Sequence, residues 1–215
     1  MRKRILFYYI PSRYQMVSAT DKKVRNLVLK FKDGNKKASR LVADLVCKEL
    51  QSLFGSGTKN VMLACVPTSS YRKYVKRFAL MSELVAAGLH QQNAFPYIEI
   101  FGLRDAKHLN KDHMVHDDSC YQVRVDPHFF QGKKVVIFDD LITSGRSAEA
   151  FRKMMEDAGA EVVGSIFLAE TAKGVPYNVK PVGIDQFTIE PVEGLRMDEF
   201  FENINQINHL IYSES

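Results

Sequence analysis

Cysteine and long apolar runs are both scarce in this chain of 215 residues. Its three cysteines, Cys47, Cys65 and Cys120, form no Cys-x-x-Cys pair, which argues against a zinc ribbon or a disulfide framework. The apolar run at residues 5–10 is too short for a signal-peptide core or a membrane span. No Gly-x-x-x-x-Gly-Lys-Ser/Thr run occurs, which argues against a nucleotide hydrolase with a phosphate loop. We therefore expect a cytoplasmic protein with no membrane partner.

Positive charge is concentrated in the first part of the chain. Residues 1–80 contain 18 Lys and Arg against 4 Asp and Glu, a net charge of +14. Residues 81–215 contain 12 against 21, a net charge of −9, which leaves +5 for the whole chain. A positive segment of this density attracts polyphosphates or nucleic acid. The alternative is a solvated basic face, or one that docks on the acidic part of the same chain.

Apolar periodicity alternates along the chain between strand-like and helix-like segments. Helical spacing predicts helices over 38–53, 71–89 and 148–158, and short apolar runs predict strands at 5–10, 61–66, 97–101, 134–138 and 162–169. Residues 102–131 lack a long periodic run, and a connection of that length is usually functional or mobile. The tail 198–212 is amphipathic and is expected to pack on the body. The alternation predicts one α/β domain over 1–215, with a mainly parallel sheet flanked by helices.

The segment 135–147 combines a buried strand, two acids and a loop of small residues that opens a helix. Ligands of parallel sheets bind beyond the carboxyl ends of the strands, and this segment provides such an end. Gly145 allows the backbone to approach a ligand closely. The N–H groups of 143–147 can surround a phosphate at the helix N-terminus. The carboxylates of Asp139 and Asp140 suit two adjacent sugar hydroxyls, or a metal bridging them, and could stabilise positive charge on a ribose ring.

The same thirteen residues resemble the ribose-phosphate diphosphate signature of type I phosphoribosyltransferases, which has four apolar residues, two acids and a Thr/Ser/Gly loop. The resemblance implies that the protein binds 5-phosphoribosyl 1-diphosphate with Mg²⁺ and transfers the phosphoribosyl group to a nitrogen of an unidentified base or amine. The metal would contact Asp139 and Asp140 only through the substrate. The substrate-binding residues implied by the signature are Asp139, Asp140, Leu141, Ile142, Thr143, Ser144, Gly145, Arg146 and Ser147.

A narrower resemblance, to ComF-type competence-associated proteins, covers roughly residues 25–171 and leaves 1–24 and 172–215 as peripheral or hood elements. It depends on the helix region 27–54 and on Val66-Pro67-Thr68 with the basic residues that follow, Arg72, Lys73, Lys76 and Arg77. By position, Thr68, Ser69 and Ser70 would form a diphosphate loop, with Arg72 or Lys73 nearby. The long loop would be a lid with Arg104, Lys107, His108 and Lys111, of which Arg104 and Lys107 are catalytic candidates beside Asp139 and Asp140.

Some features depart from these families. The four-cysteine zinc finger of many ComF-type proteins is absent, and only Arg77-Phe78 represents their Arg-Gly-Phe-Asn-Gln run. Thr143 stands where 6-oxopurine transferases carry an acid, which disfavours hypoxanthine and guanine as acceptors. The spacing of His108, His113 and His116 matches no closed metal site.

A rival function is a non-catalytic module of the same fold, active in DNA uptake or regulation, that binds nucleic acid through the basic N-terminal half or binds a nucleotide. These folds often pair, which is compatible with a homodimer. The sequence leaves the acceptor and the oligomeric state open.

Overall fold

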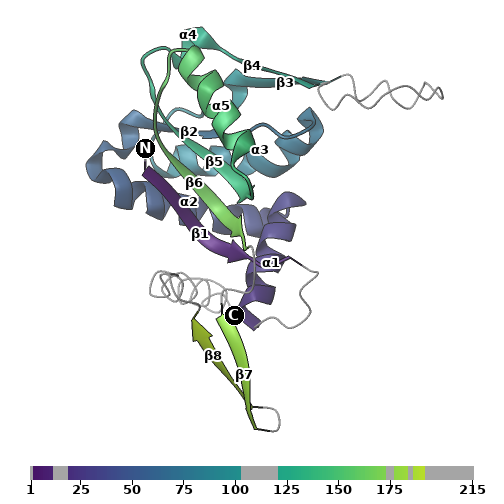
Figure 1. Cartoon of the computed structure of the whole chain (residues 1–215). Coiled ribbons are helices and arrows are strands. Elements are labelled where there is room, and N and C mark those ends of the chain that lie inside the picture. The colour runs from purple at the N-terminus through teal and green to yellow at the C-terminus, as the bar shows by residue number, and fades with distance from the viewer. Residues whose placement is uncertain (1, 12–18, 103–120, 173–176, 184–185, 192–215) are drawn as a thin grey trace, which may run out of the picture.

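A four-stranded parallel sheet forms the centre of the molecule. The computed structural model describes residues 2–11, 19–102, 121–172, 177–183 and 186–191 (Figure 1). The sheet has the strand order β1-β6-β5-β2, and each of its pairings is parallel. Its strands are β1 (Arg2–Tyr9), β2 (Val61–Cys65), β5 (Lys134–Ile142) and β6 (Glu161–Thr171). The predicted α/β fold with a parallel sheet flanked by helices is confirmed.

Helices lie on both faces of this sheet. In Figure 1, α1 (Ala19–Lys32), α2 (Lys36–Phe54) and α3 (Tyr71–Gly88) lie behind the strands, and α5 (Arg146–Asp157) crosses in front of them. The side chain of Asn35 caps α2 by accepting a hydrogen bond of 3.1 Å from the Ala38 amide. The amides of the first helical turn have no intrahelical acceptor, and this side chain supplies one. The short helix η1 (Gly55–Asn60) follows α2 and leads into β2.

The residues Asp33-Gly34-Asn35 form the turn that joins α1 to α2. Gly34 has a φ of +68°, a conformation that L side chains rarely adopt. A Cβ atom at this position would lie 2.4 Å from the backbone oxygen of Lys76 in α3. The glycine therefore lets the turn pass close to α3.

Three phenylalanines join the helices behind the sheet to the central strand. Phe31 of α1, Phe78 of α3 and Phe138 of β5 are each fully buried. Their ring centroids lie 5.9 to 6.2 Å apart in tilted or edge-to-face arrangements, which aromatic rings favour. This contact sets the positions of α1 and α3 relative to β5.

Two further pairs of strands lie outside the main sheet. Strand β3 (Ile98–Gly102) follows the short helix η2 (Phe95–Tyr97) and pairs antiparallel with β4 (Tyr121–Val125), which the short helix α4 (Pro127–Phe130) follows. Strands β7 (Tyr177–Gly183) and β8 (Gln186–Pro191) form an antiparallel pair that extends below the sheet in Figure 1. This pair follows the carboxyl end of β6 in the chain.

The structure corrects three boundaries. Within the long connection, residues 121–125 form β4 and residues 127–130 form α4. The strand is too short to show a long periodic run, and its antiparallel pairing with β3 supplies its backbone hydrogen bonds. Strand β5 continues to Ile142 instead of ending at residue 138, because β6 pairs with it as far as Ile142. The stretch 1–24 is not wholly peripheral, since β1 is an edge strand of the main sheet and its Phe7 is buried.

Candidate functional site

The two loops identified in the sequence lie at the same edge of the sheet. The loop 66–70 follows β2 and the loop 143–147 follows β5, and these neighbouring strands run parallel with Cys65 opposite Phe138. The Val66 amide donates a hydrogen bond of 2.8 Å to the Phe138 carbonyl, which extends the pairing to the start of the first loop. Both expected loops thus lie at the end of the sheet that is formed by the carboxyl ends of its strands, where parallel sheets bind ligands, and β5 continues to Ile142 before the loop 143–147 begins.

The loop 143–147 ends at the uncapped N-terminus of α5. Gly145 is the N-cap residue, with a left-handed φ of +76° and no side-chain cap. The Glu149 amide donates to the Gly145 carbonyl at 2.9 Å, so the helical hydrogen-bond pattern starts there and the preceding amides of the first turn have no intrahelical partner. Such amides, at the positive end of the helix dipole, can bind an anion.

Hydroxyl groups surround the same loop. The Thr143 hydroxyl lies 2.8 Å from the hydroxyl of Thr171 at the end of β6, and the Arg146 Nε atom donates to the Ser144 hydroxyl at 3.5 Å. The Thr143 contact connects the loop to β6 as well as to β5. The loop is thereby supported by two strands and one helix.

The loop 66–70 is ordered by its own side chains. The Thr68 hydroxyl donates to the Ser70 carbonyl at 3.0 Å, and the Ser70 side chain caps α3 by accepting from the Lys73 amide at 3.4 Å. The Lys73 ammonium lies 3.4 Å from the Ser69 hydroxyl, and both Arg72 and Lys73 are exposed. Two cations therefore stand beside this loop with access to solvent.

Asp139 and Asp140 project to opposite faces of the sheet. Successive side chains of a strand alternate between faces, and β5 continues through both residues. Phe138 packs against α1 and α3, and Asp140 shares its face. Ile137 lines a cavity beside α5, and Asp139 shares that face. The sequence analysis expected both acids to face one sugar, and the structure does not bring their side chains together in that way.

Asp140 is buried in a cluster of ion pairs behind the sheet. Its side chain is 4% exposed, its Oδ2 atom lies 2.5 Å from Nη1 of Arg77 in α3, and its Oδ1 atom lies 3.7 Å from Nζ of Lys32 in α1. Burial raises the pKa of Asp140, and the charges of Arg77 and Lys32 oppose this rise by favouring the carboxylate. Sequence reasoning missed Lys32 and the role of Arg77, because no spacing in the chain pairs either residue with position 140.

Asp139 has a different environment on the α5 face. Its Oδ1 atom accepts a hydrogen bond of 2.8 Å from the Asp140 amide, and within the described part of the chain no cation forms an ion pair with it. Burial raises the pKa of Asp139 to about 7, and the charge of Asp140 adds to the rise. A carboxyl group with such a pKa changes its protonation state near neutral pH, and unlike Asp140 it forms no ion pair within the described part of the chain.

A cavity of about 690 Å³ lies along the front of the sheet beside α5. Its floor includes the buried residues Ile137, Ser165 and Phe167, and the loop residues Ser144, Gly145 and Arg146 line one part of it. The cavity therefore reaches the loop 143–147. It gives a ligand at the N-terminus of α5 room to extend along the sheet.

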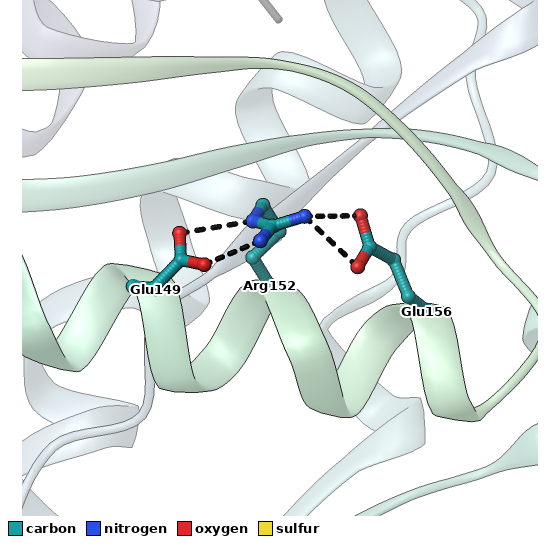
Figure 2. A network of polar contacts seen from close by, with 3 residues as sticks. All are labelled: Glu149, Arg152 and Glu156. Carbon is teal, nitrogen blue, oxygen red and sulfur yellow. Dashed lines mark hydrogen bonds and ion pairs between the residues drawn. The ribbon is translucent and has the colours of Figure 1, made fainter.

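Arg152 on the rim of this cavity is engaged within its own helix. Its guanidinium group lies between Glu149 and Glu156, one turn away on either side (Figure 2). The Nε atom donates to Glu149 at 2.9 Å, and Nη1 donates to both oxygens of Glu156 at 2.7 and 2.9 Å. Two carboxylates thus surround this cation, which leaves it poorly suited to bind an anionic ligand.

The two described cysteines have thiols whose pKa is raised by burial. Cys65 is buried next to Ser82, and burial raises the pKa of its thiol to about 12. Burial likewise raises the pKa of Cys47 to about 11, and the charge of Asp44 adds to this rise. A thiol with so high a pKa is largely protonated at neutral pH, and the protonated form is a poor nucleophile.

Several cations of residues 1–80 form ion pairs with acids of the same chain. Lys3 pairs with Glu170 at 3.2 Å and Arg4 with Glu49 at 3.0 Å, besides the two cations at Asp140. The pairs with Glu170 and Asp140 connect residues 1–80 to the acidic part of the chain. This agrees with the alternative that the basic face docks on the acidic part of the same chain. Exposed cations remain on α1 and α2, and nucleic-acid binding stays a prediction.

Other features of the described segments can be placed briefly. No helix among them is long and apolar enough to cross a membrane, and they contain no group of three or more His, Cys, Asp or Glu arranged to hold a metal ion. The lid candidates Arg104, Lys107, His108 and Lys111, the histidines His113 and His116, and the tail 198–212 lie outside the described residues.

Comparisons with known proteins agree with this geometry. A family model described as a phosphoribosyl transferase domain matches residues 33–190. Among curated proteins, adenine phosphoribosyltransferase of Thermosipho melanesiensis is 52% identical over 40 residues, which cover 19% of this chain and 23% of that protein. Adenine phosphoribosyltransferase of Jannaschia sp. is 37% identical over 82 residues, covering 38% and 41%. Xanthine phosphoribosyltransferase 1 of Clostridium perfringens is 30% identical over 92 residues, covering 39% and 48%.

These matches span less than half the length of the curated relatives. A crystal structure of adenine phosphoribosyltransferase from Rhodothermus marinus is similar with a TM-score of 0.37 and 20% identity, over 59% of this chain and 66% of that one. The family model covers most of the chain, including both loops and both acids of β5. The chain therefore belongs to the phosphoribosyl transferase domain family.

Proposed function

We propose that this protein binds 5-phosphoribosyl 1-diphosphate and transfers its phosphoribosyl group to a nitrogen of a purine base. In this reaction the bond between ribose C1 and the diphosphate oxygen breaks, a bond from C1 to the base nitrogen forms, and that nitrogen loses its proton to solvent or to a base. The observation that carries the proposal is the meeting of the loops 66–70 and 143–147 at one sheet edge, within a chain of this family.

Each end of the substrate has a counterpart in the site. The uncapped amides at the start of α5 suit the 5′-phosphate. The hydroxyls of Thr68, Ser69 and Ser70 and the cations Arg72 and Lys73 suit the diphosphate. Asp139 suits a ribose hydroxyl, and its carboxylate would stabilise positive charge that develops on the ring when diphosphate leaves. Arg104 and Lys107 are retained as lid candidates on the basis of sequence.

Mg²⁺ fits this site as an ion carried by the substrate. The described residues contain no cluster of carboxylates that would hold it alone, and Asp139 offers one carboxylate on the ligand side. Mg²⁺ is commonly held by one or two carboxylates together with substrate phosphates. When bound, it would offset the charge of the departing diphosphate.

The acceptor class comes from the relatives, whose names specify adenine and xanthine. Thr143 at the position where 6-oxopurine enzymes carry an acid favours adenine over hypoxanthine and guanine. We also retain the narrower hypothesis that the protein is of ComF type, on the residues that carry that resemblance.

The test is diphosphate release with adenine, xanthine, hypoxanthine or guanine as acceptor, with and without Mg²⁺. We expect release with a purine, dependence on Mg²⁺, and loss of release in Asp139→Asn. Glu156→Gln is the matched control, because it removes a carboxylate at the far end of α5 and should keep full activity. Absence of sugar-diphosphate binding by the wild-type protein, together with salt-sensitive binding of single-stranded DNA, would instead favour the non-catalytic module.

A further inference from the structure

The ion pairs of Asp140 connect the two sides of the proposed site. Lys32 is the last residue of α1, Arg77 lies in α3, and Asp140 lies in β5. Helix α3 begins directly after the loop 66–70, and β5 leads into the loop 143–147. At 1.5 Å per residue, Arg77 lies only about 10 Å along the helix from Ser70. A charge cluster at this point therefore sits between the two ligand-binding loops.

Asp140 is poorly placed to touch a ligand itself. Its side chain is 4% exposed and lies on the face that carries Phe138. Its Oδ1 and Oδ2 atoms lie 3.7 Å from Lys32 Nζ and 2.5 Å from Arg77 Nη1, and Oδ2 has no partner with hydrogen-bond geometry in the described part of the molecule. The Arg77 side chain is only 18% exposed, and its Nε atom has no hydrogen-bond partner in the described part of the molecule. Turning Asp140 toward a sugar would leave this guanidinium buried without a counter-ion, which is strongly unfavourable.

We propose that Asp140 is a positioning residue that, through Arg77 and Lys32, holds α3 and its diphosphate loop at a fixed distance from the sugar-phosphate loop, whereas Asp139 alone contacts the sugar. This inference rests on the proposed function. The close passage of Gly34 against α3 beside Arg77, and the 3.4 Å pair between Asp33 and Lys76, support it, because they hold the end of α1 against the same turn of α3.

Two ligands separate contact from positioning. Inorganic diphosphate carries the diphosphate group without the sugar, so the ratio of its dissociation constant to that of 5-phosphoribosyl 1-diphosphate measures the contribution of the sugar phosphate. Both constants are measured by calorimetry with Mg²⁺ on the full chain. In Asp139→Asn we expect the sugar diphosphate to bind about tenfold or more weakly, since hydrogen bonds to a charged group are lost, with little change for inorganic diphosphate.

In Asp140→Asn we expect both ligands to bind more weakly by a similar factor, so that the ratio is kept. Arg77→Met should have the same effect on both ligands. Arg77→Lys should keep part of the affinity that Arg77→Met loses. The double variant Asp140→Asn/Arg77→Met should lose no more affinity than either single variant. If Asp140→Asn does not fold, Lys32→Met replaces it with the same expected direction, because Lys32 is the more exposed partner.

The outcomes distinguish this inference from the function on which it rests. A fall of the ratio in Asp140→Asn equal to that in Asp139→Asn would show that Asp140 contacts the sugar and overturn the inference alone. A lower Tm with both affinities unchanged would also overturn it, because the cluster would then serve stability only. A wild-type protein that binds inorganic diphosphate but not the sugar diphosphate would instead refute the proposed function.

Discussion

The two faces of β5 differ in how completely they are filled. Behind the strand, Phe138 packs into a cluster of three aromatic rings and Asp140 is held by two cations. In front of it, Ile137 borders a cavity of about 690 Å³ and Asp139 has only a backbone amide as its hydrogen-bond partner. Neighbouring residues with the same side chain thus have different surroundings, because the strand directs Asp140 to the packed rear face and Asp139 to the face whose neighbour Ile137 borders the cavity.

This difference separates stability from binding within one short segment. A packed face tolerates little change, since interiors have the density of organic crystals and buried charges need their partners. A face beside a cavity can change its side chains at a lower cost in stability. Substitutions on the rear face should therefore lower the free energy of unfolding more than equivalent substitutions on the front face.

The largest expected effect comes from the aromatic residues of the two faces. Phe138→Ala should lower the free energy of unfolding by about 4 kcal/mol, because it opens a hole among rigid rings. Phe167→Ala on the front face should lower it less, by about 3 kcal/mol, because Phe167 already borders a cavity. Urea unfolding of both variants measures the difference, and equal losses would contradict the contrast between the faces.

Removal of the rear carboxylate should follow in size. Asp140→Asn should lower the free energy of unfolding by about 3 kcal/mol, since it leaves the largely buried Arg77 without its counter-ion. Asp139→Asn is the matched control and should not destabilise the protein at pH 8, where burial opposes the charged form of the native residue. Comparable destabilisation by both substitutions would remove the distinction between the two acids.

Two left-handed glycines provide a smaller test. Gly34→Ala should destabilise the protein by about 2 kcal/mol, because strain at φ +68° adds to the collision with the Lys76 backbone. Gly145→Ala has strain of the same kind but only ordinary contacts, the nearest being 3.5 Å from Ile142, and should cost about 1 kcal/mol. Thermal unfolding measures both losses. We also expect Gly145→Ala to weaken sugar-diphosphate binding although it lowers Tm less, because Gly145 lies in the loop 143–147 itself.

The pH dependence of stability should report on Asp139. Its pKa rises on folding from 3.8 to about 7, so the folded protein holds a proton that the unfolded chain has released between these values. The stabilisation from this group is complete below pH 3.8 and is lost as the pH rises through about 7. The wild-type protein should therefore lose stability relative to Asp139→Asn between pH 5 and 8, and parallel pH profiles in urea unfolding would contradict the assignment.

The smallest effect is expected at the exposed network of α5. Arg152→Ala removes pairs with Glu149 and Glu156 that lie in solvent, where such pairs contribute little (Figure 2). We expect no measurable change in Tm and no change in sugar-diphosphate binding. A clear loss of affinity would show that Arg152 contacts a ligand in the cavity.

The sequence by itself determined the fold class, the phosphoribosyl transferase domain family and the position of the segment 135–147 at the carboxyl end of a strand. Alternating apolar runs predict strands and helices from local periodicity, and the signature over 135–147 is contiguous, so both can be recognised without knowing any distant contact. That the loops 66–70 and 143–147 follow neighbouring strands was decided by the tertiary structure, which pairs β2 with β5.

Only the tertiary structure decided how the two acids differ. The strand continues to Ile142 because β6 pairs with it, and this pairing sends Asp139 and Asp140 to opposite faces. The partners of Asp140 come from helices 108 and 63 positions earlier in the chain, and their approach depends on packing at Phe31, Phe78 and Gly34. Charge pairing across such separations is set by the positions of whole helices, which no local pattern encodes.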